Sequence, residues 1–160
     1  MKHIEINIAQ QVLRLYDDDT LLFSASISTA KNGPGEWRNS ECTPRGEHEI
    51  HALIGEGCAE NTVFVSREQT GELYSERLAA EHPDRDWILS RIIWLSGLEP
   101  GVNQGGEVDS KDRFIYIHGT PDSEPMGIPM SHGCIRMRNH DVVDLFDYLD
   151  TGIHVMISED

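Results

Sequence analysis

The sequence predicts a mainly β protein that carries one packed helix near its C-terminus. Short stretches in which apolar and polar residues alternate recur along the chain, and turns rich in Gly, Pro and Asp separate them. Alternation with a period of two is typical of strands with one buried face. Apolar residues at clear helical spacing occur over residues 140–150.

Length and composition narrow the class of protein. The chain has 160 residues, which predicts a single domain, residues 1–160, large enough to bury a core. A hydrophobic content of 38% and a charged content of 26% are typical of a folded soluble protein. The formal net charge is −15. Because nucleic acids and anionic membranes attract basic surfaces, we expect neither as a partner.

The N-terminal part predicts an antiparallel meander of three strands. Isoleucine alternates with polar residues over residues 4–8, which indicates the first strand. Residues 12–16 and 21–28 are the next two strands, and the acidic run 17–19 forms the turn between them.

No export signal or membrane-spanning segment is visible. The N-terminus lacks the apolar region and the small-residue cleavage site of a signal peptide. No run of about 18 apolar residues occurs. We therefore expect a cytoplasmic protein, with a periplasmic location as the alternative if an export signal has been removed. We also expect a monomer.

The middle of the chain predicts further strands between loops. Residues 29–46 are rich in Gly and Pro and predict turns, and a strand over residues 48–54 follows them. A short strand is expected at 62–66, whereas the polar stretch 71–83 fits no single element. Residues 86–96 are apolar enough to be a buried strand or a buried helix, and their β-branched and aromatic content favours a strand.

The C-terminal part predicts the one clear helix. Asn139 is a residue type that caps helices, so we expect a helix over residues 140–150. Gly152 is placed to end it, and a last strand is expected at 153–157. Four apolar residues share one helical face: Val142, Leu145, Phe146 and Leu149.

The stretch from 113 to 137 carries the candidate chemistry. An apolar run, residues 114–117, ends at His118, and a proline-rich loop leads from there to Cys134. Two strand-like pieces joined by a rigid loop could bring His118 beside Cys134. A thiol needs such a base to become a thiolate near neutral pH. Gly133 leaves room for a substrate backbone and frees nearby N–H groups to face an oxyanion.

These residues resemble the signature of the YkuD-type L,D-transpeptidases, the cysteine enzymes that remodel peptidoglycan stem peptides. That signature is a His-Gly pair followed, after a loop, by Ser-His-Gly-Cys and an apolar-plus-Arg tail, here residues 118–119 and 131–137. The resemblance implies a β-sandwich with one packed C-terminal helix. Family members also carry a Ser-Thr pair, as at 28–29, and a Thr-Pro-x-Gly segment, as at 43–46. We expect the latter to shape the rim of the site.

The resemblance assigns roles to individual residues. Cys134 is the expected nucleophile and His118 the expected base, which later protonates the leaving amine. In the family the backbone carbonyl after this histidine, here that of Gly119, orients the imidazole. His132 could be a second base, a structural donor or part of the oxyanion region, and a structural, substrate-facing role is favoured. The N–H groups of Gly133 and Cys134 are the expected oxyanion donors.

Ser131 and Arg136 are expected to bind the substrate. Ser131 should also hold the turn by local hydrogen bonds. Arg136 follows Cys134 by two residues, so on a strand it would share a face with the thiol. A guanidinium can bind a carboxylate with two parallel hydrogen bonds, although a surface salt bridge is the alternative.

Two other classes of protein are alternatives. A zinc site could draw ligands from His118, His132, Cys134 and His140. These histidines lack the helical spacing of zinc proteases, and we expect neither a metal nor a cofactor. A binding module of the same fold without activity is the other alternative. Cys42 and Cys58 have no such surroundings and are expected to be inert.

The implied reaction is acyl transfer from a murein tetrapeptide at the bond between the L-centre of diaminopimelate and D-Ala. Transfer to water would make the chain an L,D-carboxypeptidase of murein recycling. Transfer to an amine would form 3→3 cross-links or exchange D-amino acids. The expected cytoplasmic location favours hydrolysis.

Overall fold

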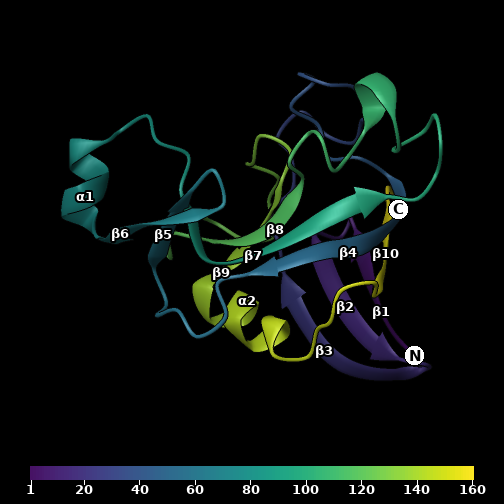
Figure 1. Ribbon diagram of the computed structural model, residues 1–160, viewed down its shortest axis with the longest axis horizontal. Helices are drawn as coiled ribbons and strands as arrows, with labels where there is room; N and C mark the ends of the chain where they lie inside the picture. Colours follow the sequence, from purple (N-terminus) through teal and green to yellow (C-terminus); the bar gives the residue numbers. More distant parts are fainter.

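The computed structural model describes residues 1–160, and its fold is mostly β, as predicted. The strands join one hydrogen-bonded sheet that curls around the core, with helix α2 packed on it (Figure 1). The strands are β1 (Lys2–Asn7), β2 (Val12–Asp17), β3 (Thr20–Ser26), β4 (Gly46–Ile54), β5 (Thr62–Val65), β6 (Glu68–Leu73), β7 (Ile88–Gly97), β8 (Tyr116–Thr120), β9 (Ile135–Arg138) and β10 (His154–Ser158). The helices are α1 (Glu76–Glu81), α2 (Asn139–Phe146) and a 3-10 turn (Gly106–Val108).

The order of the strands brings distant parts of the sequence together. The sheet runs β3-β2-β1-β10-β4-β7-β5-β6, and β8 lies against β7 on one side and β9 on the other. Strands β1 to β3 form the predicted antiparallel meander. The first and last strands, β1 and β10, pair in parallel, so the two ends of the chain close the sheet together.

The core lies inside the curl of the sheet, under α2. Alternate residues of the strands point inward, as the period-two pattern predicts, and Ile117, Ile135 and Met137 of β8 and β9 are fully buried. Helix α2 adds Val142 and Leu145 and packs against β7, β8 and β9. The strands that carry the candidate residues therefore pack with one face against the largest apolar cluster of the protein.

Two segments that the sequence left open are now assigned. The stretch 86–96 forms the strand β7 rather than a helix. The polar stretch 71–83 contains the end of β6 and the short helix α1, whose first turn is capped by Ser75. The Ser75 hydroxyl accepts a hydrogen bond from the N–H of Leu78 at 3.1 Å.

The predicted boundaries of the C-terminal helix were wrong at both ends. Its capping residue is Arg138, and Asn139 is already helical, with a buried side chain that bonds elsewhere. The helix ends at Phe146, and Leu149 lies beyond it but is also buried in the core. Gly152 does not end the helix. It has φ +85° and lies in the turn before β10, where its N–H donates to Ile50.

The strand predicted over residues 114–117 is displaced. Strand β8 begins at Tyr116 and continues through His118 and Gly119, so the histidine lies within the strand rather than after it. Phe114 lies outside the strand, has φ +57° and is 47% exposed.

Neither helix has the length and apolar character that crossing a membrane requires. The three cysteines are unpaired.

Candidate active site

Strands β8 and β9 bring the two halves of the signature together. They pair in parallel, with Ile117 opposite Ile135 and His118 opposite Arg136. Because the isoleucines face the core, the side chains of His118 and Arg136 lie on the other face. Cys134 immediately precedes β9, and its Sγ lies 3.4 Å from the backbone nitrogen of Tyr116. The thiol therefore contacts β8 two residues before His118.

The Cys134 thiol is held in its neutral form. It donates to the carbonyl oxygen of Phe114 at 3.3 Å and accepts a hydrogen bond from the N–H of Tyr116. Burial raises the pKa of Cys134 to about 12, a rise that the Tyr116 N–H and two nearby arginines oppose. No hydrogen bond joins the thiol to His118 in this conformation.

His118 has the protonation state that a base requires. It is 1% exposed, and its Nδ1 lies 2.7 Å from the carbonyl oxygen of Gly119. A carbonyl can only accept, so Nδ1 carries the hydrogen and Nε2 keeps its lone pair. Burial lowers the pKa of His118 below its ordinary value, against the effect of the Gly119 carbonyl. The imidazole is therefore neutral near pH 7.

Ser131 holds the turn before Cys134. Its hydroxyl donates to the carbonyl of Cys134 at 2.5 Å and accepts from the N–H of Gly133 at 3.2 Å. Ser131 is 2% exposed, so its hydroxyl is used within the turn rather than presented to a substrate. Of the two expected oxyanion donors, the Gly133 N–H is thus occupied. The N–H of Cys134 has no partner in the chain.

Gly133 is required by both conformation and space. Its φ of +135° lies in the region that favours glycine, and an added Cβ would lie 3.3 Å from the carbonyl oxygen of Cys42.

Two segments with family resemblance form the rim of the turn. The Thr43 hydroxyl donates to the carbonyl of Gly133 at 2.9 Å and accepts from the N–H of Ala30 at 2.9 Å. Ser28 exchanges two backbone hydrogen bonds of 2.9 Å with Arg136. Both segments therefore touch the signature directly without presenting a reactive group.

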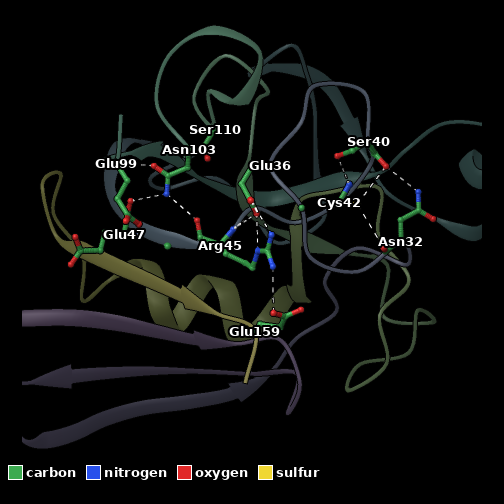
Figure 2. Close-up of polar contacts among 12 residues, drawn as sticks. Asn32, Glu36, Ser40, Cys42, Arg45, Glu47, Glu99, Asn103, Ser110 and Glu159 are labelled. Carbon is green, nitrogen blue, oxygen red and sulfur yellow. Dashed lines mark hydrogen bonds and ion pairs between the residues drawn. The ribbon is translucent and has the colours of Figure 1, made fainter. Parts of the chain in front are cut away.

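Two arginines, Arg45 and Arg113, hold the loop that precedes β4, and Figure 2 shows the contacts of Arg45. Arg45 forms a two-pronged pair with Glu36, at 2.9 and 3.0 Å, and also reaches Glu159 at 3.4 Å. Arg113 donates to the carbonyls of Glu36 at 3.1 Å and Cys42 at 2.7 Å. These partners lie more than 70 positions from Arg113 in the sequence, so no local pattern reveals the contacts.

Arg136 lies on the face of the site, as predicted, but it already has a partner. Its Nη2 lies 3.4 Å from an Oδ1 of Asp86, and the arginine is 9% exposed while the Asp86 side chain is 52% exposed. This single contact is not the two-pronged geometry of a strong carboxylate pair. Asp86 was not identified from the sequence.

Two cavities flank the turn, and His132 lines both. The larger, about 340 Å³, contains Cys134 and Gly133 together with Arg38 and Arg113. The smaller, about 180 Å³, contains Arg136 and Asp86. His132 is exposed at their junction, a position that fits the substrate-facing role expected for it.

The candidate zinc ligands are not gathered. His118 is buried in β8, whereas His140 is exposed on α2 and lies near Asp144 and Glu60, at 3.2 and 3.7 Å. The chain contains no group of three His, Cys, Asp or Glu side chains that could hold a metal ion.

A curled, mostly β sheet, with a histidine on one of two parallel strands and a cysteine immediately before the other, is the arrangement expected of L,D-transpeptidases. The sequence profile of the YkuD L,D-transpeptidase catalytic domain matches residues 1–157. The chain therefore belongs to the L,D-transpeptidase family.

Relatives agree with this assignment. A putative L,D-transpeptidase, YqjB, of Bacillus subtilis is 44% identical over 57 residues, which are 35% of this chain and 32% of YqjB. The probable L,D-transpeptidase ErfK/SrfK of Salmonella typhimurium is 44% identical over 45 residues, 28% of this chain and 15% of that protein. The chain thus matches a third or less of the length of these relatives.

Solved structures show the same fold. L,D-transpeptidase 3 from Mycobacterium tuberculosis, in complex with a faropenem-derived adduct, aligns with a TM-score of 0.60 at 16% identity, over 99% of this chain and 60% of that one. An L,D-transpeptidase from Mycobacterium smegmatis aligns with a TM-score of 0.55 at 18% identity, over 98% and 58%.

Proposed function

We propose that this chain catalyses acyl transfer from peptidoglycan stem tetrapeptides, with Cys134 as nucleophile and His118 as base. Two observations carry the proposal: the thiol of Cys134 contacts β8 at Tyr116, two residues before His118, and the Gly119 carbonyl fixes the tautomer that leaves Nε2 of His118 free. The family assignment supports the class of substrate.

The proposed reaction begins when the Cys134 side chain turns from Phe114 toward His118. Nε2 takes the thiol proton while Sγ forms a bond to the carbonyl carbon of the L-centred residue. The Cys134 N–H stabilises the oxyanion. His118 then returns the proton to the leaving amine of D-Ala, the C–N bond breaks, and a thioester remains on Cys134.

The arginines near the thiol suit an anionic substrate. The stem peptide ends in a carboxylate, and the diaminopimelate side chain carries another. A protein of net charge −15 repels such a peptide unless positive groups lie locally. Arg38 and Arg113 line the larger cavity beside Glu41 and Asp112, and Arg136 lines the smaller one beside Asp86 and two further carboxylates. A substrate carboxylate would therefore be bound by individual guanidinium groups and not by a cavity of net positive charge.

For the acyl acceptor we propose water, which makes the chain an L,D-carboxypeptidase. An acceptor peptide would add a second anionic chain to an acidic protein, whereas water adds none. The second candidate function is L,D-transpeptidation, favoured by the two arginine-bearing cavities on either side of His132, since one could hold each peptide. The cytoplasmic location stays a prediction.

One incubation tests both candidates. The protein is mixed with purified murein tetrapeptide, with and without an excess of a D-amino acid, and the products are read by mass spectrometry. Tripeptide in both mixtures supports hydrolysis, and an exchanged or cross-linked peptide supports transfer. Unchanged tetrapeptide, with the protein folded by circular dichroism, rejects both.

A further inference from the structure

Asn139 contacts Gly119, the residue after the proposed base, whereas the sequence predicts a helix cap at this position. Its side chain is 1% exposed and does not cap α2. Its Nδ2 donates to the carbonyl of Thr120 at 2.9 Å and to Oδ1 of Asn61 at 2.9 Å. Its Oδ1 accepts from the hydroxyl of Ser90 at 2.6 Å. The amide thus connects α2 to β7, β8 and the residues before β5.

Ser90 lies where the pairing of β7 with β8 is interrupted. Leu89 pairs with Gly119 and Ile92 with His118, so Ser90 and the residue after it have no counterpart on β8. Ser90 is fully buried and has φ +71°, a conformation that costs free energy for a residue with a side chain. Such bulges change the direction of neighbouring side chains, and this one lies directly opposite the His118–Gly119 peptide.

Gly119 is packed tightly between Asn139 and Leu89 of β7. A Cβ at this position would lie 2.5 Å from Oδ1 of Asn139 and 2.5 Å from the carbonyl oxygen of Leu89. The Asn139 amide therefore touches the residue whose carbonyl accepts the hydrogen of His118 Nδ1, and it also holds the next carbonyl, that of Thr120.

We infer that Asn139 and Ser90 are positioning residues that fix the Gly119 carbonyl and, through it, the ring orientation and tautomer of His118. Neither residue touches the thiol or a substrate. The inference rests on the proposed function in one respect, since it takes His118 to be the base. If the Gly119 carbonyl turned away, Nδ1 would lose its acceptor. The tautomer with the hydrogen on Nε2, which cannot act as the base, would then also be populated.

The test measures both the histidine and the turnover. Asn139→Ala removes the whole connection, and Ser90→Gly removes one donor while suiting the positive φ. The matched control is Asn103→Ala. Asn103 is also fully buried and makes three hydrogen bonds, with Arg45, Glu47 and Glu99, in the loop network of Figure 2. The readouts are the nitrogen chemical shifts of His118 and the kinetics on murein tetrapeptide.

In the wild type the shifts should show hydrogen on Nδ1. Asn139→Ala should give a mixture of tautomers and lower kcat by up to about 100-fold, the scale of a misplaced catalytic group, with KM nearly unchanged. Ser90→Gly should cause a smaller loss in the same direction. Asn103→Ala should lower thermal stability without changing tautomer or kcat.

The outcomes separate this inference from the proposed function. Wild-type His118 shifts in folded Asn139→Ala and Ser90→Gly would overturn the inference, whatever the turnover. Equal changes in Asn103→Ala would also overturn it, since they would show a general loss of packing. A wild type without turnover, whose tautomer still depends on Asn139, would reject the proposed function and keep the positioning role.

Discussion

The Sγ of Cys134 lies 3.3 Å from the carbonyl oxygen of Phe114, and this contact holds the thiol away from its proposed base. Phe114 has φ +57°, a strained conformation for an aromatic residue, and it aims its carbonyl at the thiol. The guanidinium of Arg67 lies 4.7 Å from the centre of the Phe114 ring and holds it in place. A carbonyl can bond only to the protonated sulfur, so the contact favours the neutral thiol.

The first prediction concerns the reactivity of this thiol without substrate. Because burial raises the pKa of Cys134 to about 12, alkylation by iodoacetamide should be slow at pH 7 and should rise about tenfold per pH unit up to pH 11. Rates are read from the peptide that contains Cys134. A rate that is already constant near pH 7 would mean that a thiolate paired with protonated His118 exists at rest.

The second prediction concerns the identity of the nucleophile. Cys134→Ala should abolish turnover of the tetrapeptide and leave the fold intact, because the side chain is small and lies at the edge of the core. Cys58→Ala is the matched control, since Cys58 packs against the same apolar cluster and should retain most activity. Turnover by the Cys134→Ala protein would rule out Cys134 as the nucleophile.

The sequence predicts that His118 and Cys134 lie on two neighbouring strand-like pieces, and this prediction depends on local patterns alone. Isoleucines on either side of these residues define which face of β8 and β9 is buried, and that places both reactive groups on the other face. The β class followed from the same alternation. These features need only neighbouring residues, so they can be recognised without the fold.

The errors concern residues whose partners lie far along the chain. Asn139 has the local character of a helix cap, yet its amide bonds to Thr120 and Asn61, which no local pattern reveals. Phe114 continues an apolar run, but its backbone leaves the strand to meet the thiol. Asp86 lies 50 positions from Arg136, and only the folded sheet brings the two together.

The third prediction concerns stability in acid. His48 is fully buried, with its ring nitrogens bonded to the Gly46 carbonyl and the Ser110 hydroxyl. Burial lowers the pKa of His48 to about 4, against an ordinary value of 6.5. Between these values the unfolded chain binds a proton that the folded chain does not, so the free energy of unfolding should fall as pH falls from 6.5 to 4. The free energy of unfolding should therefore be about 3 kcal/mol higher above pH 6.5 than below pH 4, as far as His48 alone is concerned.

Urea unfolding of the wild type and of His48→Gln across this pH range measures the effect. Glutamine does not titrate, so the variant should be less stable at pH 7 but should lose less stability on acidification. Parallel curves for the two proteins would show that His48 titrates normally in the folded state.

The fourth prediction concerns Arg136 and the substrate. Its guanidinium makes one hydrogen bond, with Asp86, and lines the smaller cavity, so other donors remain available for a substrate carboxylate. Arg136→Ala should lower kcat/KM, with a loss of about 1.5–3 kcal/mol in transition-state stabilisation, because a charge-assisted hydrogen bond is removed. Arg136→Lys should restore only part of this, because a point charge cannot reproduce the planar fork.

Asp86→Asn distinguishes substrate binding from a structural ion pair. If Arg136 binds the substrate, removing the competing carboxylate should leave kcat/KM unchanged or raise it, since Asp86 is half exposed and costs little to neutralise. If the pair is structural, Asp86→Asn should reproduce the loss seen in Arg136→Ala. The charge of Arg136 adds to the lowering of the His118 pKa by burial and opposes the rise that burial causes in the Cys134 pKa. Alkylation of Cys134 is therefore measured in every variant to separate that effect from substrate binding.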